Sequence, residues 1–164
     1  MDKISSKFVS GKDNLVKLVL SIAIPVLVGM TSGFFTDAQS EWYLGLQGPF
    51  FQPPGWLISI VWITLYILMG IAFYMIWKKG FSENKKPIAL FSIQLAINFS
   101  WSFVFFTFQS LWGGLIVMLI MLFFVVWTAW EFYKVSKKAG YLFIPYIVWI
   151  FIAMSVNIAF IILN

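Results

Sequence analysis

Apolar and polar residues along this chain fall into long blocks rather than short alternating patterns. Five stretches of about twenty residues are almost entirely apolar, and only the fourth contains a charged residue, Glu131. A helix rises about 1.5 Å per residue, so each stretch can span the roughly 30 Å hydrocarbon core of a bilayer. We therefore predict an all-α integral membrane protein, a bundle of five transmembrane helices. They are placed at residues 18–35, 57–77, 88–108, 114–132 and 141–163.

The charged residues divide the chain between two sides of the membrane. All eleven basic residues are lysines, and they lie only within residues 1–17, 78–87 and 134–140. Five spans put these segments on one side, and lysine-rich segments stay in the cytoplasm. We therefore predict a cytoplasmic N-terminal tail over residues 1–17, a domain in the cell membrane over residues 18–164, and a C-terminus outside. This asymmetry explains the formal charge of +5 without any nucleic-acid partner.

The composition also limits the chemistry. The chain contains no cysteine and no histidine, so it offers no thiol nucleophile, no imidazole base and none of the commonest ligands for metals and haem. We expect no metal site and no required cofactor. Because no acid or base other than tyrosine lies deep in a predicted span, proton relays, ion coupling and conventional hydrolytic catalysis are poorly supported.

A proline-rich loop leads directly into the second span. Pro49, Pro53 and Pro54 stiffen the backbone just before it, and Trp62 and Tyr66 then follow one helical face. Trp62 lies about 8 Å inside the span, deeper than an interfacial tryptophan needs to be. These aromatic residues either pack between helices or line a pocket for which the loop is a lid.

The third span carries two different stripes. Gln94, Asn98 and Ser102 recur every four residues and are joined by Trp101, whereas the small residues Ser92, Ala96 and Ser100 lie on a nearly opposite face. Amides are costly in lipid, so the polar stripe should face the protein interior, as interhelical hydrogen bonds or as a binding site. The small-residue row permits close helix packing, either within the protomer or in a homodimer.

The last span completes a possible site between the helices. Tyr146, Trp149, Ala153 and Asn157 share one of its faces. By helical rise, Ala153 and Asn98 both lie about 15 Å from the outer surface, and Tyr66 lies at about 14 Å. Stripes at a common depth predict a ligand site within the bundle. Glu131 is instead predicted to form an ion pair with Lys134, three residues later.

Four segments together resemble the TspO/MBR family, which comprises bacterial tryptophan-rich sensory proteins and mitochondrial translocator proteins. They are EWYLGLQGPFFQPPGW, VWITLYILMGIAFY, QLAINFSWSFVFF and PYIVWIFIAMSVN. The resemblance implies a five-helix membrane bundle, often dimeric, with a ligand pocket beneath the first loop. It also implies ligands such as porphyrins and other flat aromatic molecules.

The resemblance implies binding roles for particular residues. They are Trp42, Tyr43, Pro53, Pro54, Trp62, Tyr66, Asn98, Trp149 and Ala153, to which the stripes add Trp101 and Tyr146. Trp62 and Trp149 match two tryptophans that the family links to light-dependent porphyrin degradation. Gly55 departs from relatives that have arginine there, so this loop offers no cation for a propionate.

The expected function is that of a membrane receptor or sensor for protoporphyrin IX-like tetrapyrroles, with slow light-dependent degradation as a further activity. A metal-free porphyrin fits best, because the usual axial ligands of iron are missing. The alternatives are a porphyrin transporter or efflux regulator, and a scaffold that modulates a membrane partner.

Overall fold

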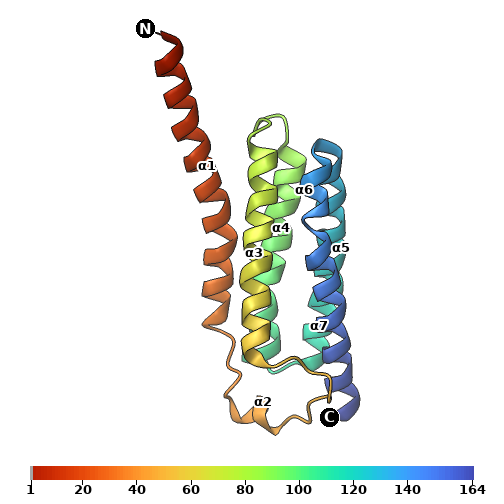
Figure 1. The fold of residues 1–164 in the computed structure, drawn as a ribbon. Helices are drawn as coiled ribbons and strands as arrows, with labels where there is room; N and C mark the ends of the chain where they lie inside the picture. Colours follow the sequence, from red (N-terminus) through yellow and green to blue (C-terminus); the bar gives the residue numbers. More distant parts are fainter. Residues whose placement is uncertain (1) are drawn as a thin grey trace.

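The computed structural model describes the backbone of residues 2–164 and the side chains from Lys12 onward. Helices are the only regular elements within this range, and Figure 1 shows them as one elongated bundle. They are α1 (Asp2–Gly33), α2 (Glu41–Gly45), α3 (Gly55–Trp77), α4 (Lys85–Ser102), the π-helical turn η1 (Phe103–Thr107), α5 (Leu111–Val135), α6 (Lys137–Tyr141) and α7 (Ile144–Leu163).

Within the described part of the chain, five helical segments are long and apolar enough to cross a membrane, which confirms the predicted fold class. They cover residues 12–33, 55–77, 85–107, 111–135 and 137–163. The termini lie at opposite ends of the bundle (Figure 1), as an odd number of spans requires.

The bounds of all five spans differ by a few residues from the predicted ones, and three features of the backbone were not predicted. The backbone of residues 2–17 continues α1 rather than forming a separate tail; Met1, also part of the predicted tail, lies outside the described residues. The third span changes from α-helix to the η1 turn at Phe103. The fifth span is divided into α6 and α7, because the backbone turns at Leu142 and Phe143 before Pro145 enters the first turn of α7.

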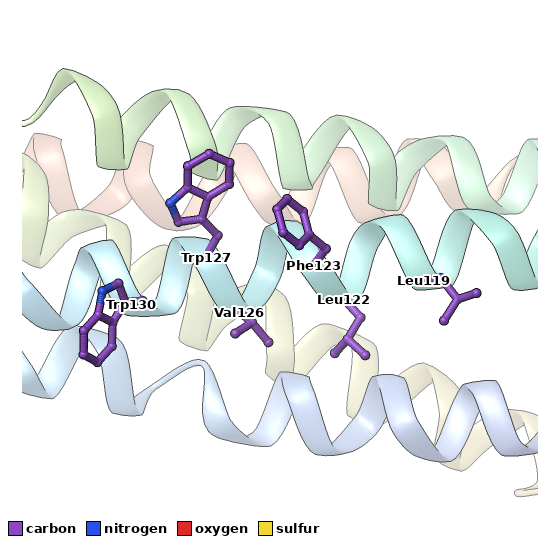
Figure 2. Close-up of a pocket in the computed structure, with 6 residues that line it drawn as sticks. All are labelled: Leu119, Leu122, Phe123, Val126, Trp127 and Trp130. Carbon is purple, nitrogen blue, oxygen red and sulfur yellow. The ribbon is translucent and has the colours of Figure 1, made fainter.

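The helices form a closed ring in the order α1, α3, α6–α7, α5, α4. Thus α1 packs against α3 and α4, while α5 packs against α4 on one side and against α6 and α7 on the other. The short helix α2 lies in the loop at the C-terminal end of the bundle (Figure 1). The outward face of α5 is apolar and hollowed (Figure 2), as expected for a surface that meets lipid.

Glycines set the distance between α1 and α3. A Cβ on Gly70 would lie 2.5 Å from the Cα of Ile22, so the two backbones nearly touch there. A Cβ on Gly29 would overlap the Tyr66 ring, whereas nothing lies within 4 Å of one on Gly33. Gly29 and Gly33 lie four residues apart on α1, and only Gly29 is in close contact with α3, through the Tyr66 side chain.

We predict that Gly29→Val destabilises the protein by about 1–3 kcal/mol, because the added methyl groups must displace the buried Tyr66 ring. Thermal unfolding in detergent, followed by circular dichroism, measures the change. Gly33→Val is the matched control, with open space around the same substitution. Equal melting temperatures for the two variants would contradict this account of the α1–α3 contact.

Candidate functional site

The side-chain amide of Asn98 joins three helices at the centre of the bundle. The Tyr66 hydroxyl on α3 donates to Asn98 Oδ1 at 2.6 Å, and Asn98 Nδ2 donates to the Tyr146 hydroxyl on α7 at 2.7 Å. Met121 brings in α5, with its sulfur 3.3 Å from the Tyr146 hydroxyl and 3.5 Å from Asn98 Nδ2. All four side chains are buried. The Asn98 amide thus provides a hydrogen-bond partner for two phenol hydroxyls in a region without bulk water.

Trp62 covers this polar centre on the side of α3. Its ring stacks on Tyr66, with centroids 5.7 Å apart and planes inclined by 28°. It also meets the Tyr146 ring edge to face at 6.0 Å. We call Trp62, Tyr66, Asn98, Met121 and Tyr146 the central cluster. It presents aromatic faces together with amide and phenol groups in one place.

A second group of aromatic residues lies between the helices and the first loop. Phe105 in η1 is its hub: Trp101 stacks on it at 5.0 Å, and Trp42 meets it edge to face at 5.6 Å. Tyr43 contacts both Phe105 and Phe106, and Phe160 on α7. We call this group the loop cluster. Sequence reasoning missed Phe105, although it lies seven residues beyond Asn98 on the same helical face.

The loop is held over the bundle by side-chain hydrogen bonds. Gln52 Nε2 donates to the Tyr43 hydroxyl at 2.9 Å, and Asn164 bonds both the N–H and the carbonyl of Gln47. Burial raises the pKa of Tyr43, and the Gln52 bond only partly offsets this effect, so the phenol stays neutral at physiological pH. Pro53 is half-buried, and the exposed Pro54 is the N-cap of α3.

Asn98, Trp101 and Phe105 follow one face of α4 and η1, so this face connects the two clusters. On α4 and α7, several side-chain polar atoms are buried and have no hydrogen-bond partner among the described residues. They are the indole nitrogens of Trp101 and Trp149, both amide atoms of Asn157 and the side-chain oxygen Oε1 of Gln94. Trp149 and Ala153 pack against the same hydrophobic core as the central cluster. Buried polar groups without partners are costly unless a water or a ligand satisfies them.

The predicted depth of Ala153 is wrong. Tyr146, rather than Ala153, lies level with Asn98, because the two side chains are hydrogen-bonded. Ala153 is seven residues further along α7 and therefore about 10 Å closer to the loop end. The prediction assumed that all helices end at one plane, whereas α7 extends beyond α4 and α5 toward the loop (Figure 1).

Below the central cluster, phenylalanines fill the bundle. Phe73 stacks on Phe91 at 4.7 Å, Phe91 on Phe132 at 5.8 Å, and Phe132 meets Phe143 edge to face at 5.2 Å. These rings are all buried. The lysine-bearing end of the interior is therefore filled mostly with packed rings, and the unpaired indole and amide N–H donors lie toward the loop.

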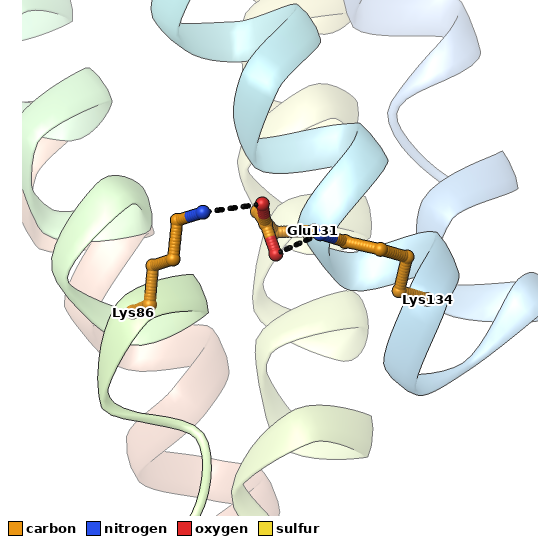
Figure 3. Close-up of polar contacts among 3 residues, drawn as sticks. All are labelled: Lys86, Glu131 and Lys134. Carbon is orange, nitrogen blue, oxygen red and sulfur yellow. Dashed lines mark hydrogen bonds and ion pairs between the residues drawn. The ribbon is translucent and has the colours of Figure 1, made fainter.

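Glu131 makes the predicted ion pair with Lys134 at 2.6 Å and a second one with Lys86 at 2.8 Å (Figure 3). Lys86 was missed because it lies on α4, 45 residues earlier in the chain. From Lys12 onward, no group of three acidic or histidine side chains could hold a metal ion. Glu131 is thus paired with two lysines at the lysine-bearing end of the bundle and is not part of the central cluster.

A family model and the sequences of known proteins all relate this chain to one family of membrane proteins. The sequence model of the TspO/MBR family matches residues 21–163. The chain is 40% identical to the tryptophan-rich protein TspO of Archaeoglobus fulgidus, over 92% of this chain and 99% of that protein. It is 36% identical to the human translocator protein, over 71% of each chain, and 34% identical to the tryptophan-rich sensory protein of Cereibacter sphaeroides, over 71% and 73%.

We predict that Asn98→Leu destabilises the protein, because it removes one hydrogen bond from each of two buried phenols, at about 1–3 kcal/mol for a group left unsatisfied. A double-mutant cycle with Tyr66→Phe should show coupling, so that Tyr66→Phe costs less in the Asn98→Leu background. Unfolding in detergent measures both the loss of stability and the coupling energy. Tyr74→Phe, whose hydroxyl has no hydrogen bond among the described residues, is the control. Strictly additive effects of the Asn98 and Tyr66 changes would show that the amide does not hold Tyr66.

Proposed function

Because this chain belongs to the TspO/MBR family, we propose that it is a multi-pass membrane receptor for porphyrins such as protoporphyrin IX. The ligand would lie between the helices and beneath the loop at residues 36–54. The observation that carries this proposal is that one continuous face of α4 and η1 joins the central cluster to the loop cluster. Two stacking surfaces separated by about 10 Å of helix suit a broad, flat ligand.

The buried polar atoms support the proposal chemically. A metal-free porphyrin has apolar ring faces and two carboxylates, and the carboxylates need hydrogen-bond donors. The indole N–H groups of Trp101 and Trp149 and the amide of Asn157 have no partner among the described residues. A bound carboxylate or a water could accept from such donors, and each group left unpaired in a low-dielectric interior is costly.

The loop supports the proposal as a cover. Its attachments are the packing of Trp42 and Tyr43 in the loop cluster and the hydrogen bonds of Gln52 and Asn164, whereas Phe50 at its tip is fully exposed. Few buried contacts make a segment easy to open locally. Since the other end of the interior is filled by stacked phenylalanines, we propose that the ligand enters from the loop side and that the loop closes over it.

Light-dependent degradation of the porphyrin is a second part of the proposal. Trp62 is positioned by stacking on Tyr66, and Trp149 lies on the helix that carries Tyr146. An indole can give an electron to a photoexcited porphyrin, and dissolved oxygen would serve as the terminal oxidant. A transporter or efflux regulator is less well supported, because from Lys12 onward no Asp, Glu or Lys lies beside the central cluster to couple movement to ions.

We predict that Trp62→Phe and Trp149→Phe bind protoporphyrin with an affinity lowered by about 1 kcal/mol or less, because an aromatic face remains and one neutral hydrogen bond is lost. Light-dependent loss of porphyrin absorption should fall much further, because phenylalanine is not an effective electron donor. Quenching of porphyrin fluorescence measures binding, and absorption under illumination measures degradation.

The control is Trp77→Phe, at the lysine-bearing end of α3, which should change neither quantity. Porphyrin in detergent without protein gives the background rate. Degradation at the wild-type rate in both Trp62→Phe and Trp149→Phe would show that these tryptophans only pack, while normal binding would leave the receptor proposal standing.

We further propose that the protein is a homodimer that uses the row Ser92, Ala96 and Ser100 on α4. Ser92 and Ala96 are exposed and Ser100 is half-buried, so the row faces outward from the single chain. Small side chains let two helices approach closely in a membrane.

We also propose that the lysine-bearing end of the bundle faces the cytoplasm, because lysine-rich segments stay on that side of a membrane.

We predict that Ala96→Leu shifts the protein in mild detergent from dimer to monomer, because the larger side chain separates the two α4 helices. Light scattering coupled to size-exclusion chromatography measures the mass. Ile93→Leu, on an exposed position of the same helix, should leave the mass unchanged. A fully dimeric Ala96→Leu variant would place the interface elsewhere.

A further inference from the structure

The outward face of α5 carries an apolar groove. It is lined by Leu119, Leu122, Phe123, Val126, Trp127 and Trp130 and has a volume of about 480 Å³ (Figure 2). All but Leu122 are exposed. Among the described residues the lining comes entirely from α5, so this groove is separate from the central cluster, which lies on the inner side of the same helix.

The length of the groove matches one lipid chain. Leu119 and Trp130 are eleven residues apart, which corresponds to about 16 Å along the helix, close to half of the roughly 30 Å hydrocarbon core. Trp130 lies near the lysine-bearing end of α5, and Leu119 lies just beyond the middle of the helix. The groove therefore runs through the leaflet that borders the lysines.

The lysine-bearing end of the groove has a surplus positive charge. Lys86 and Lys134 share the single carboxylate of Glu131, which leaves this group of three side chains with a net charge of +1 (Figure 3). The lysine side chains are 61% and 48% exposed, and each ammonium group has two further N–H donors. They remain accessible to an anion at the membrane surface.

The charged group and the groove are in direct contact. Lys86 Nζ lies 5.6 Å from the centroid of the Trp127 ring, a groove residue, and Glu131 immediately follows Trp130. A cation is thus held beside the end of an apolar channel. This is the arrangement that a lipid with an anionic headgroup requires, since clustered lysines beside a membrane helix attract anionic lipids.

We propose that this face of α5 is a binding site for an anionic phospholipid, with one acyl chain in the groove and the phosphate against Lys86 and Lys134. A second copy of the chain suits this face less well, because a two-fold contact there would bring the same lysines of both copies together. The proposal is independent of porphyrin binding.

Native mass spectrometry of the full-length protein in detergent, titrated with dioleoyl phosphatidylglycerol or dioleoyl phosphatidylcholine, tests the site. We expect the wild type to bind the phosphatidylglycerol at least about fivefold more tightly. Lys86→Gln and Lys134→Gln should each weaken its binding about fivefold, which corresponds to about 1 kcal/mol for one lysine near an anionic surface. Neither change should affect phosphatidylcholine.

Two further variants separate this site from general effects. Lys12→Gln removes the same charge from α1, which packs against α3 and α4 rather than against α5, and should bind both lipids as the wild type does. Val126→Trp fills the groove without changing a lysine, and it should weaken the binding of both lipids.

The proposal is overturned if the wild type does not distinguish the two lipids, or if Lys12→Gln loses as much affinity as Lys134→Gln. It is also overturned if Val126→Trp binds normally or changes the protein from dimer to monomer, which would make the groove a contact between copies. Lys134 is half-exposed and leaves the Lys86–Glu131 pair in place when replaced, so this variant remains informative if Lys86→Gln does not fold.

Discussion

The hydrogen bonds of the Asn98 amide are the constraint on which the rest of the bundle depends. Within a bilayer, helices gain little from burying apolar side chains, because lipid is equally apolar, so polar pairing and close packing determine how they associate. Asn98 accepts a hydrogen bond from Tyr66 on α3 and donates one to Tyr146 on α7, and the Met121 sulfur of α5 lies beside the Asn98 amide nitrogen and the Tyr146 hydroxyl. Sliding any of these helices by one turn would move a polar group about 5.4 Å and leave it unpaired.

This fixed centre separates two regions with different properties. Toward the lysine-bearing end, stacked phenylalanines fill most of the interior, with the amide of Gln94 buried between them and the central cluster. Toward the loop, aromatic rings from α2, η1 and α7 meet around Phe105, and several buried indole and amide atoms have no partner in the described part of the chain. Dense apolar packing stabilises one end, whereas the other end keeps polar groups that a ligand or water can satisfy. We infer that stability and binding are assigned to opposite ends of one bundle.

The outer surface shows a similar division. Apolar residues cover the membrane-facing sides, and the charged side chains of the transmembrane region gather at one boundary, where Glu131 is held by two lysines. Pairing lowers the cost of a carboxylate close to hydrocarbon, and the second lysine leaves excess positive charge at that boundary. The same residues therefore link α4 to α5 and give this end of the protein surface a net positive charge.

The sequence alone determined the fold class and the number of spans, because bilayer thickness fixes the length of an apolar helix, and it identified the polar stripe of α4, because an amide in a span must find a partner. It also predicted the Glu131–Lys134 pair, since residues three apart on a helix are neighbours. Only the tertiary structure decided which residues meet across helices: Tyr146 rather than Ala153 beside Asn98, and Lys86 beside Glu131. These contacts depend on how far each helix is shifted along its axis, and that shift is set by glycine contacts and by the loop that α7 extends to meet. Helical periodicity reports the face on which a residue lies, but not its height relative to another helix.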